Sequence, residues 1–141
     1  MPGFILDASV TLPWRFEDEA TVWTEALLNR VARGEEVIVP AHWALEVANG
    51  LLTALRRGRV TAGQVQEFCE DLAAFPIRVE RAYVPEQWSA IISLAERHGL
   101  TVYDASYLEL SQRSGLPLAT LDQDLRKAAR EACVPLVEPL S

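Results

Sequence analysis

Residues 4–10 read Phe4-Ile5-Leu6-Asp7-Ala8-Ser9-Val10. The first three form a short apolar run that follows Gly3 and ends at the acid Asp7. Short apolar runs bounded in this way are typical of strands buried on both faces of a parallel sheet. Similar runs return along the chain. We therefore predict five strands, at residues 4–6, 37–39, 77–79, 116–120 and 136–137.

The segments between these runs repeat their apolar residues at helical spacing. Trp23, Leu27 and Val31 form one such series and Gly34 ends it, and two more series surround Phe68 and Ile91. Strands that alternate with helices predict an α/β fold with a mainly parallel sheet. At 141 residues, the length suits a single domain over residues 1–141.

Composition narrows the functional classes. No stretch of about 18 apolar residues is present and no basic leader precedes the first strand, so we expect a cytoplasmic protein without a membrane span. The two cysteines fit no metal or redox spacing. The net charge of −7 is unusual for an enzyme that acts on nucleic acid, because Lys and Arg usually contact the phosphates. If the substrate is RNA, bound cations must supply part of the positive charge.

Four acids lie at positions that a parallel sheet brings together. Asp7 directly follows the first predicted strand, and Asp122 follows the fourth. Asp104 opens a predicted helix, and Glu46 lies in the helix after the second strand. Right-handed crossovers place all strand carboxyl ends at one edge of the sheet, where ligands bind in such folds.

Each acid also has a purely structural explanation. Asp7, Asp104 and Asp122 stand where helices begin, and Asp is a favoured N-cap. Glu46 lies opposite an aliphatic helix face and beside Trp43, so it is either solvated or turned toward a site or a second subunit.

Taken together, the four acids predict a cation site. Crowded carboxylates repel one another, and a divalent cation relieves this repulsion. All-oxygen ligands favour Mg²⁺ or Mn²⁺, which can orient and activate water for phosphodiester hydrolysis. The supporting polar residues that we expect around this site are Ser9, Asn49, Thr120 and Asp124. Local turn bonds or a favourable helix dipole would explain Ser9, Thr120 and Asp124 equally well.

Other chemistries lack their motifs. The sequence contains no G-x-x-x-x-G-K-[ST] or G-x-G-x-x-G phosphate loop and no G-x-S-x-G nucleophile elbow. A phosphoacceptor domain would need a lysine after the last strand, but Lys127 precedes it. A haloacid-dehalogenase-like phosphatase would need D-x-D-x-T at Asp7, where the chain has Asp7-Ala8-Ser9-Val10-Thr11.

Four stretches follow one another in order along nearly the whole chain, namely residues 4–10, 40–49, 103–108 and 118–125. In these stretches the chain resembles PIN-domain nucleases, and in size it is similar to VapC-type toxins of bacterial toxin–antitoxin pairs. The resemblance implies a PIN-like three-layer fold with about five mainly parallel strands flanked by helices. It also implies Mg²⁺- or Mn²⁺-dependent endoribonuclease activity, a homodimer and neutralisation by a VapB-like antitoxin. Under this resemblance the catalytic and metal-binding residues are Asp7, Glu46, Asp104 and Asp122.

Two other functions stay open at this point. One is a PIN-like nuclease of RNA processing without a toxin role, and the other is an inactive binding module whose acids only cap helices. For an RNA-docking surface the candidates are Arg56, Arg57 and Arg59, which would equally suit a solvated helix end.

Overall fold

The computed structural model describes residues 3–81 and 83–138. In this part of the chain, four strands alternate with α-helices, and two short 3-10 helices (Leu12–Trp14 and Glu17–Glu19) follow the first helix. The elements in chain order are β1 (Phe4–Leu6), α1 (Ala8–Thr11), α2 (Val22–Ala32), β2 (Val37–Val39), α3 (Trp43–Arg56), α4 (Ala62–Ala74), β3 (Ile77–Val79), α5 (Pro85–His98), α6 (Val102–Ser114), β4 (Leu118–Ala119) and α7 (Gln123–Glu131).

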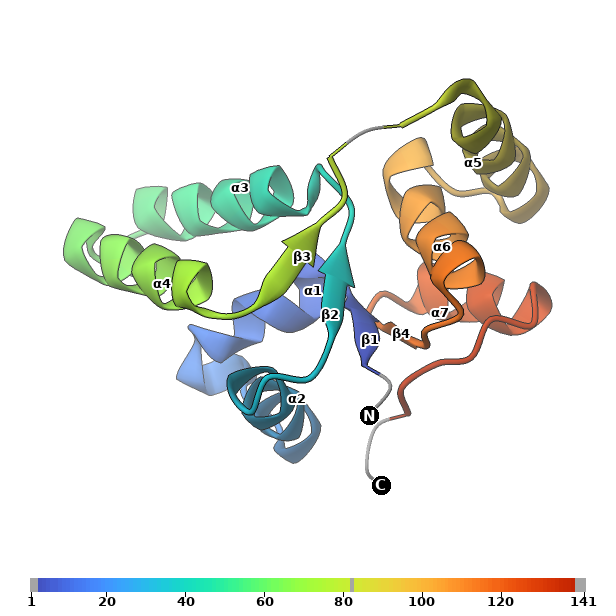
Figure 1. Ribbon diagram of the computed structural model, residues 1–141. Coiled ribbons are helices and arrows are strands. Elements are labelled where there is room, and N and C mark those ends of the chain that lie inside the picture. The colour runs from blue at the N-terminus through green and yellow to red at the C-terminus, as the bar shows by residue number, and fades with distance from the viewer. Residues whose placement is uncertain (1–2, 82, 139–141) are drawn as a thin grey trace.

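The strands form one parallel sheet in the order β3-β2-β1-β4. The chain moves outward from β1 through β2 to β3 and then returns across β1 to β4, so right-handed crossovers place the two sets of helices on opposite faces. Figure 1 shows α3 and α4 on one side of the sheet and α6 and α7 on the other. This arrangement confirms the predicted α/β architecture, and all three residues of β1 are completely buried at its centre.

The sheet is smaller at one edge than predicted. The fourth strand is confined to Leu118–Ala119, and the fifth is reduced to a single parallel bridge between Leu118 and Leu136. Leu118 donates its N–H to the carbonyl of Pro135, and Val137 donates to the carbonyl of Leu118. Pro135 has no N–H of its own, so the ladder cannot continue through it.

Helix α3 is rotated differently from the prediction. Trp43, which we placed beside Glu46 opposite the aliphatic face, is buried, and its indole N–H donates to Thr11 Oγ1 at 3.0 Å. Gly50 faces Leu12 so closely that a Cβ on it would lie 2.5 Å from the leucine Cδ1. These contacts hold α3 against the segment that follows β1. Within the described residues, no helix is both long and apolar enough to cross a membrane.

Candidate active site

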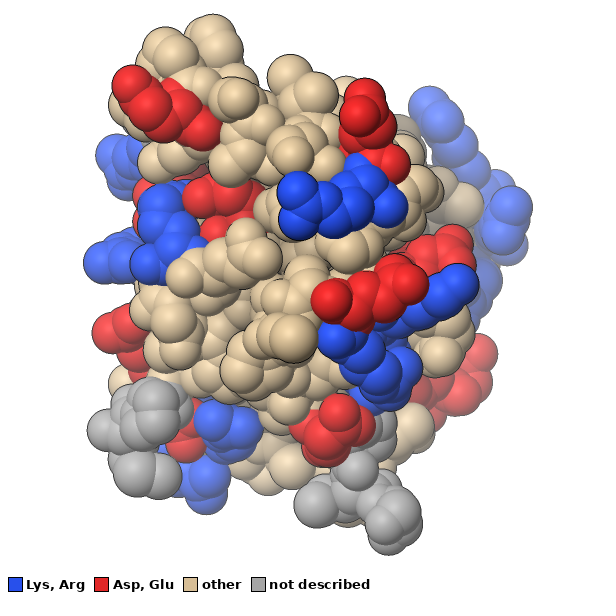
Figure 2. Space-filling model, turned by 90° about the vertical axis from the view of Figure 1, so that its right-hand side faces the viewer, with Lys and Arg blue, Asp and Glu red and all other residues tan. Residues whose placement is uncertain are grey.

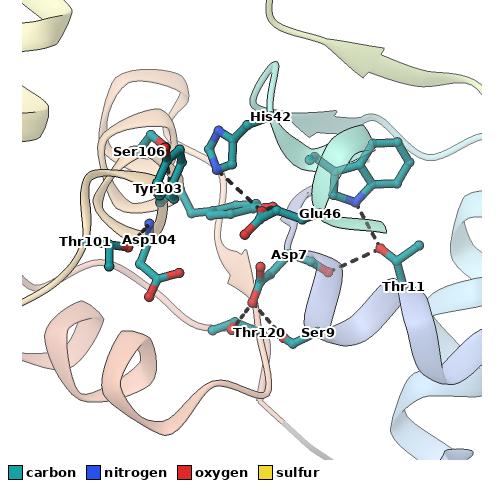
Figure 3. Close-up of polar contacts among 12 residues, drawn as sticks. Asp7, Ser9, Thr11, His42, Glu46, Thr101, Tyr103, Asp104, Ser106 and Thr120 are labelled. Carbon is teal, nitrogen blue, oxygen red and sulfur yellow. Dashed lines mark hydrogen bonds and ion pairs between the residues drawn. The ribbon is translucent and has the colours of Figure 1, made fainter. Parts of the chain in front are cut away.

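Asp7 lies directly after the central strand and is only 6% exposed. Its side chain makes no capping bond to α1. Instead, Ser9 Oγ donates to Asp7 Oδ2 at 2.6 Å and Thr120 Oγ1 donates to the same oxygen at 2.7 Å (Figure 3). Two donors on Oδ2 leave Oδ1 as the oxygen available to a ligand. Burial raises the pKa of Asp7 against the lowering effect of the two hydroxyl groups.

Asp104 does not cap its helix, contrary to the capping alternative. Helix α6 begins at Val102, two residues earlier than predicted, because Thr101 is the N-cap and its hydroxyl accepts the N–H of Asp104 at 3.1 Å. The Asp104 carboxylate therefore points away from the cap (Figure 3) and makes no hydrogen bond within the described residues. Desolvation, and after it the charges of Asp122, Asp7 and Glu46, together raise its pKa to about 6.

Glu46 projects from α3 toward α6, on the side of the helix that faces the other acids (Figure 3). Its Oε1 accepts a 2.6 Å hydrogen bond from the hydroxyl of Tyr107 and lies 3.4 Å from His42 Nε2. Burial and then the charge of Asp7 raise the pKa of Glu46, against the lowering effect of the Tyr107 hydroxyl. Burial also lowers the pKa of His42, which favours the neutral ring.

Asp122 combines a capping role with a place beside the other acids. Its Oδ1 accepts the N–H of Leu125 at 2.9 Å, so the N-cap expected from the sequence is present. Its own N–H donates to Thr120 Oγ1 at 3.1 Å, which joins it to the hydroxyl that binds Asp7. Its charge contributes to the raised pKa of both Asp7 and Asp104.

Arg126 lies behind this corner and was missed by the sequence analysis. Its side chain is buried, and Nη1 donates to the carbonyl of Thr120 at 2.9 Å while Nη2 donates to Glu138 at 3.0 Å. An arginine in a terminal helix is usually solvated, so no signal in the sequence distinguishes Arg126 from the neighbouring Lys127. Arg126 fixes the backbone from which Thr120 and Asp122 extend.

The remaining predicted neighbours have different placements. Asn49 is exposed on α3 and makes no side-chain hydrogen bond within the described part of the chain, so it does not support Glu46 here. Asp124 is exposed in the first turn of α7, and its charge contributes to the raised pKa of Asp104.

Of the three arginines that are candidates for RNA docking, Arg59 forms ion pairs with Asp18 and Glu19. Arg56 and Arg57 lie about 15 Å from Glu46 along α3, at 1.5 Å per residue.

The acids share one end of the sheet without an internal counter-ion. In residues 3–81 and 83–138, no ion pair joins Asp7, Asp104 or Asp122 to an Arg or a Lys. No three acidic, histidine or cysteine side chains among these residues already have the spacing of a formed metal centre. The arrangement is therefore an open group of carboxylates, and Asp7, Glu46 and Asp122 are each held by hydrogen-bond donors on one oxygen.

Removing the hydroxyl of Tyr107 tests how Glu46 is held. Tyr107→Phe keeps the buried ring but deletes the 2.6 Å donor to Glu46, so we expect a loss of about 1–2 kcal/mol in the free energy of unfolding. We also expect about a tenfold weaker affinity for Mn²⁺, which is the usual effect of losing a group that orients a metal ligand. Denaturant unfolding and Mn²⁺-dependent melting measure the two effects.

Tyr103→Phe is the matched control because the Tyr103 side chain is exposed and its hydroxyl makes no hydrogen bond within the described residues. It should leave both measurements unchanged. Equal effects of the two substitutions would show that the Tyr107 hydroxyl does not position Glu46.

Comparisons with known proteins agree along most of the chain. A family model of the PIN domain matches residues 4–131. Ribonuclease VapC3 of Pyrobaculum aerophilum is 31% identical over 121 residues, covering 86% of this chain and 90% of that protein. Ribonuclease VapC3 of Mycobacterium tuberculosis is 31% identical over 128 residues, covering 88% of this chain and 85% of the relative.

Solved structures show the same fold. PAE2754 from Pyrobaculum aerophilum superposes with a TM-score of 0.69 at 23% identity, covering 90% of this chain and 79% of the other. FitAcB from Neisseria gonorrhoeae gives a TM-score of 0.65 at 21% identity, with 96% and 97% covered. VapC20 of Mycobacterium tuberculosis, a sarcin–ricin loop cleaving toxin, gives 0.65 at 16% identity, with 97% and 100% covered.

Proposed function

The chain belongs to the PIN-domain family, and on that premise we propose that it is a Mg²⁺- or Mn²⁺-dependent endoribonuclease of the VapC type. The observation that carries the metal dependence is the group of four carboxylates at one end of the sheet without a cationic side chain among them. Crowded carboxylates of this kind, with Asp7 buried and the other three partly buried, repel one another, so the group favours a ligand of opposite charge.

The donor set fits a hard divalent cation. Asp7, Glu46, Asp104 and Asp122 offer only carboxylate oxygens, which Mg²⁺ and Mn²⁺ prefer, and the two histidines do not add a zinc-like set. When bound, such an ion would activate water and stabilise the charge that develops on the leaving oxygen of a phosphodiester.

Neighbouring hydroxyl groups fix the orientation of two of the carboxylates. Ser9 and Thr120 fix Asp7 through Oδ2 and so keep Oδ1 turned outward, and Tyr107 fixes one oxygen of Glu46. Asp104 carries no such restraint, so its carboxylate is free to adjust to a ligand. Burial of Asp7 at the base of the site excludes water from its back.

A shift in melting temperature tests the metal dependence directly. A hundredfold excess of Mn²⁺ over its Kd should stabilise the fold by about 2.7 kcal/mol, or about 5–10 °C for a chain of this size. Cleavage of single-stranded RNA should require the ion and stop with a chelator. Cleavage that persists in chelator, together with no Mn²⁺-dependent shift, would contradict the metal-dependent mechanism.

The surface charge is consistent with this reliance on cations. On the face formed by α5, α6 and α7, Lys and Arg alternate with Asp and Glu, and the described part of that face has no broad basic patch (Figure 2). RNA held there gains little from direct phosphate contacts, so cations at the acids must supply much of the attraction.

We further propose that the chain is the toxin of a toxin–antitoxin pair and acts in the cytoplasm on cellular RNA. The support is its similarity to proteins named VapC3 and to the VapC20 toxin. A VapB-like antitoxin encoded beside the gene and copurifying with the protein would support this role. Without such a partner, a PIN-like nuclease of RNA processing is the better description.

The outer face of α3 is the candidate surface for a homodimer. Leu45, Leu52 and Leu55 are exposed there, and Leu45 is 73% accessible. Apolar side chains gathered on one exposed helix face usually pack against another chain. Sedimentation of the purified protein as a monomer at micromolar concentration would count against a homodimer.

A further inference from the structure

A hollow opens beside the acids, between α5 and the beginning of α6. It has a volume of about 470 Å³, and its walls include His42, Tyr83, Trp88 and Tyr103. Trp88 and Tyr103 are 55% and 60% exposed, so both side chains are accessible to a ligand. We call this hollow the aromatic pocket.

The aromatic pocket and the carboxylate site share a wall. The His42 ring lies between Tyr103 and Tyr107, with ring centroids 5.5 and 5.3 Å away, and its Nε2 lies 3.4 Å from Glu46 Oε1. Tyr103 immediately precedes Asp104 in the first turn of α6 (Figure 3). A phosphodiester held at the acids therefore places one of its flanking nucleotides next to this pocket.

We propose that the aromatic pocket binds an unstacked nucleobase of single-stranded RNA, from a nucleotide flanking the bond that is cut. This inference rests on the proposed ribonuclease function and identifies the part of the RNA that the pocket binds. Tyr83, Trp88 and Tyr103 are three of the nine residues that line the pocket, whereas aromatic residues make up 8% of the chain. A concentration of open rings favours a flat π-system as the ligand.

The charge of the surroundings supports a base instead of a phosphate. Among the described residues no Lys or Arg lines the pocket, and the Glu46 carboxylate lies 3.4 Å from His42 in its wall. Phosphate would be repelled there, whereas stacking of a base on an aromatic side chain needs no cation. Stacking thus supplies attraction that the chain, with a net charge of −7, does not supply through its surface.

The pocket should accept different bases with similar affinity. Its lining is almost entirely apolar, and the Ser106 hydroxyl is already used in a 2.7 Å hydrogen bond to the carbonyl of Tyr103. A base bound there keeps its polar edge toward water, so its identity matters little. Bases inside a duplex stay stacked on one another, so single-stranded RNA is the form that fits.

The test uses a single-stranded RNA that the wild-type protein cuts with Mn²⁺, after the cut position has been mapped. Abasic nucleotides are placed in turn on either side of the cut. One of the two should lower kcat/KM of the wild type by about tenfold, the effect of losing one stacked base. Trp88→Ala should cause a similar loss on intact RNA and almost no further loss on the abasic RNA. Trp88→Phe, which keeps a ring, should retain most of the activity.

Tryptophan fluorescence gives a second measurement that needs no cleavage. The emission of the wild type minus that of Trp88→Phe isolates Trp88. With Ca²⁺ in place of Mn²⁺, a hard cation that takes the same oxygen ligands, the same RNA should quench this difference while its duplex form should not. Equal cleavage of abasic and intact RNA, or an unquenched Trp88, would overturn the inference even where the wild type is an active nuclease. Dissociation of a dimer by Trp88→Ala would overturn it as well, because a second copy of the chain would then cover the pocket. Quenching of Trp88 without any RNA cleavage would instead contradict the proposed function while still supporting base binding in the aromatic pocket.

Discussion

Asp7→Asn is expected to lower the rate of Mn²⁺-dependent RNA cleavage by about 100- to 1,000-fold while the fold remains intact. The substitution keeps the size of the side chain and one carbonyl oxygen for the Ser9 and Thr120 hydroxyls. It removes the only buried charge at the centre of the carboxylate group. Loss of a preorganised charged group at a reacting centre typically has an effect of this size.

The fold should tolerate this change because burial already disfavours the charged form of Asp7, as its raised pKa shows. Circular dichroism and the melting temperature in chelator should match the wild type or exceed it. Asp71→Asn is the control, since it makes the same exchange on an exposed part of α4. An Asp7→Asn protein that cuts RNA at the wild-type rate would exclude Asp7 from the catalytic site.

The sequence predicts the scaffold well because its signals are local. Three of the predicted strands, at residues 4–6, 37–39 and 77–79, coincide with β1, β2 and β3. The position of Asp7 and Asp122 after parallel strands follows from topology alone. The short edge at Leu118–Ala119 was harder to predict, because the length of an edge strand depends on the segment that pairs with it.

The orientation of the acids could not be read from the sequence. A difference of two residues at the start of α6, set by Thr101, decides whether Asp104 caps the helix or faces the site. Glu46 turns inward because Trp43 reaches Thr11 and Gly50 packs on Leu12. Both contacts join residues more than 30 positions apart, beyond the range of helical periodicity.

The residues that support the acids are also set by long-range packing. Tyr107 lies within seven consecutive buried residues of α6, so periodicity gives it no preferred face. Its hydroxyl reaches Glu46, which lies 61 residues earlier in the chain. Arg126 contacts Glu138 near the end of the described chain. Such partners appear only once the helices are placed against the sheet.

Asp104→Asn should abolish Mn²⁺-dependent cleavage and yet stabilise the metal-free protein at neutral pH. The pKa of Asp104 is raised from 3.8 to about 6, so between these values the folded state binds more protons than the unfolded state. The contribution of Asp104 to stability therefore falls as pH rises through this window and is fully unfavourable above it. The complete difference would correspond to about 3 kcal/mol. Because Asp104 is partly exposed, screening reduces our expectation to about 1 kcal/mol.

Asn imitates the protonated acid at every pH, so the two proteins should unfold with equal free energy near pH 4 and differ by about 1 kcal/mol at pH 7.5. Urea unfolding in chelator at both pH values measures this difference in the free energy of unfolding. The control is Glu96→Gln, which makes the same change of charge on the exposed side of α5 and should show no such difference. Added Mn²⁺ should reverse the order at pH 7.5, because the wild type gains the energy of binding while the variant gains much less. A variant that is less stable than the wild type in chelator at pH 7.5 would show that Asp104 serves the fold and not a cation site.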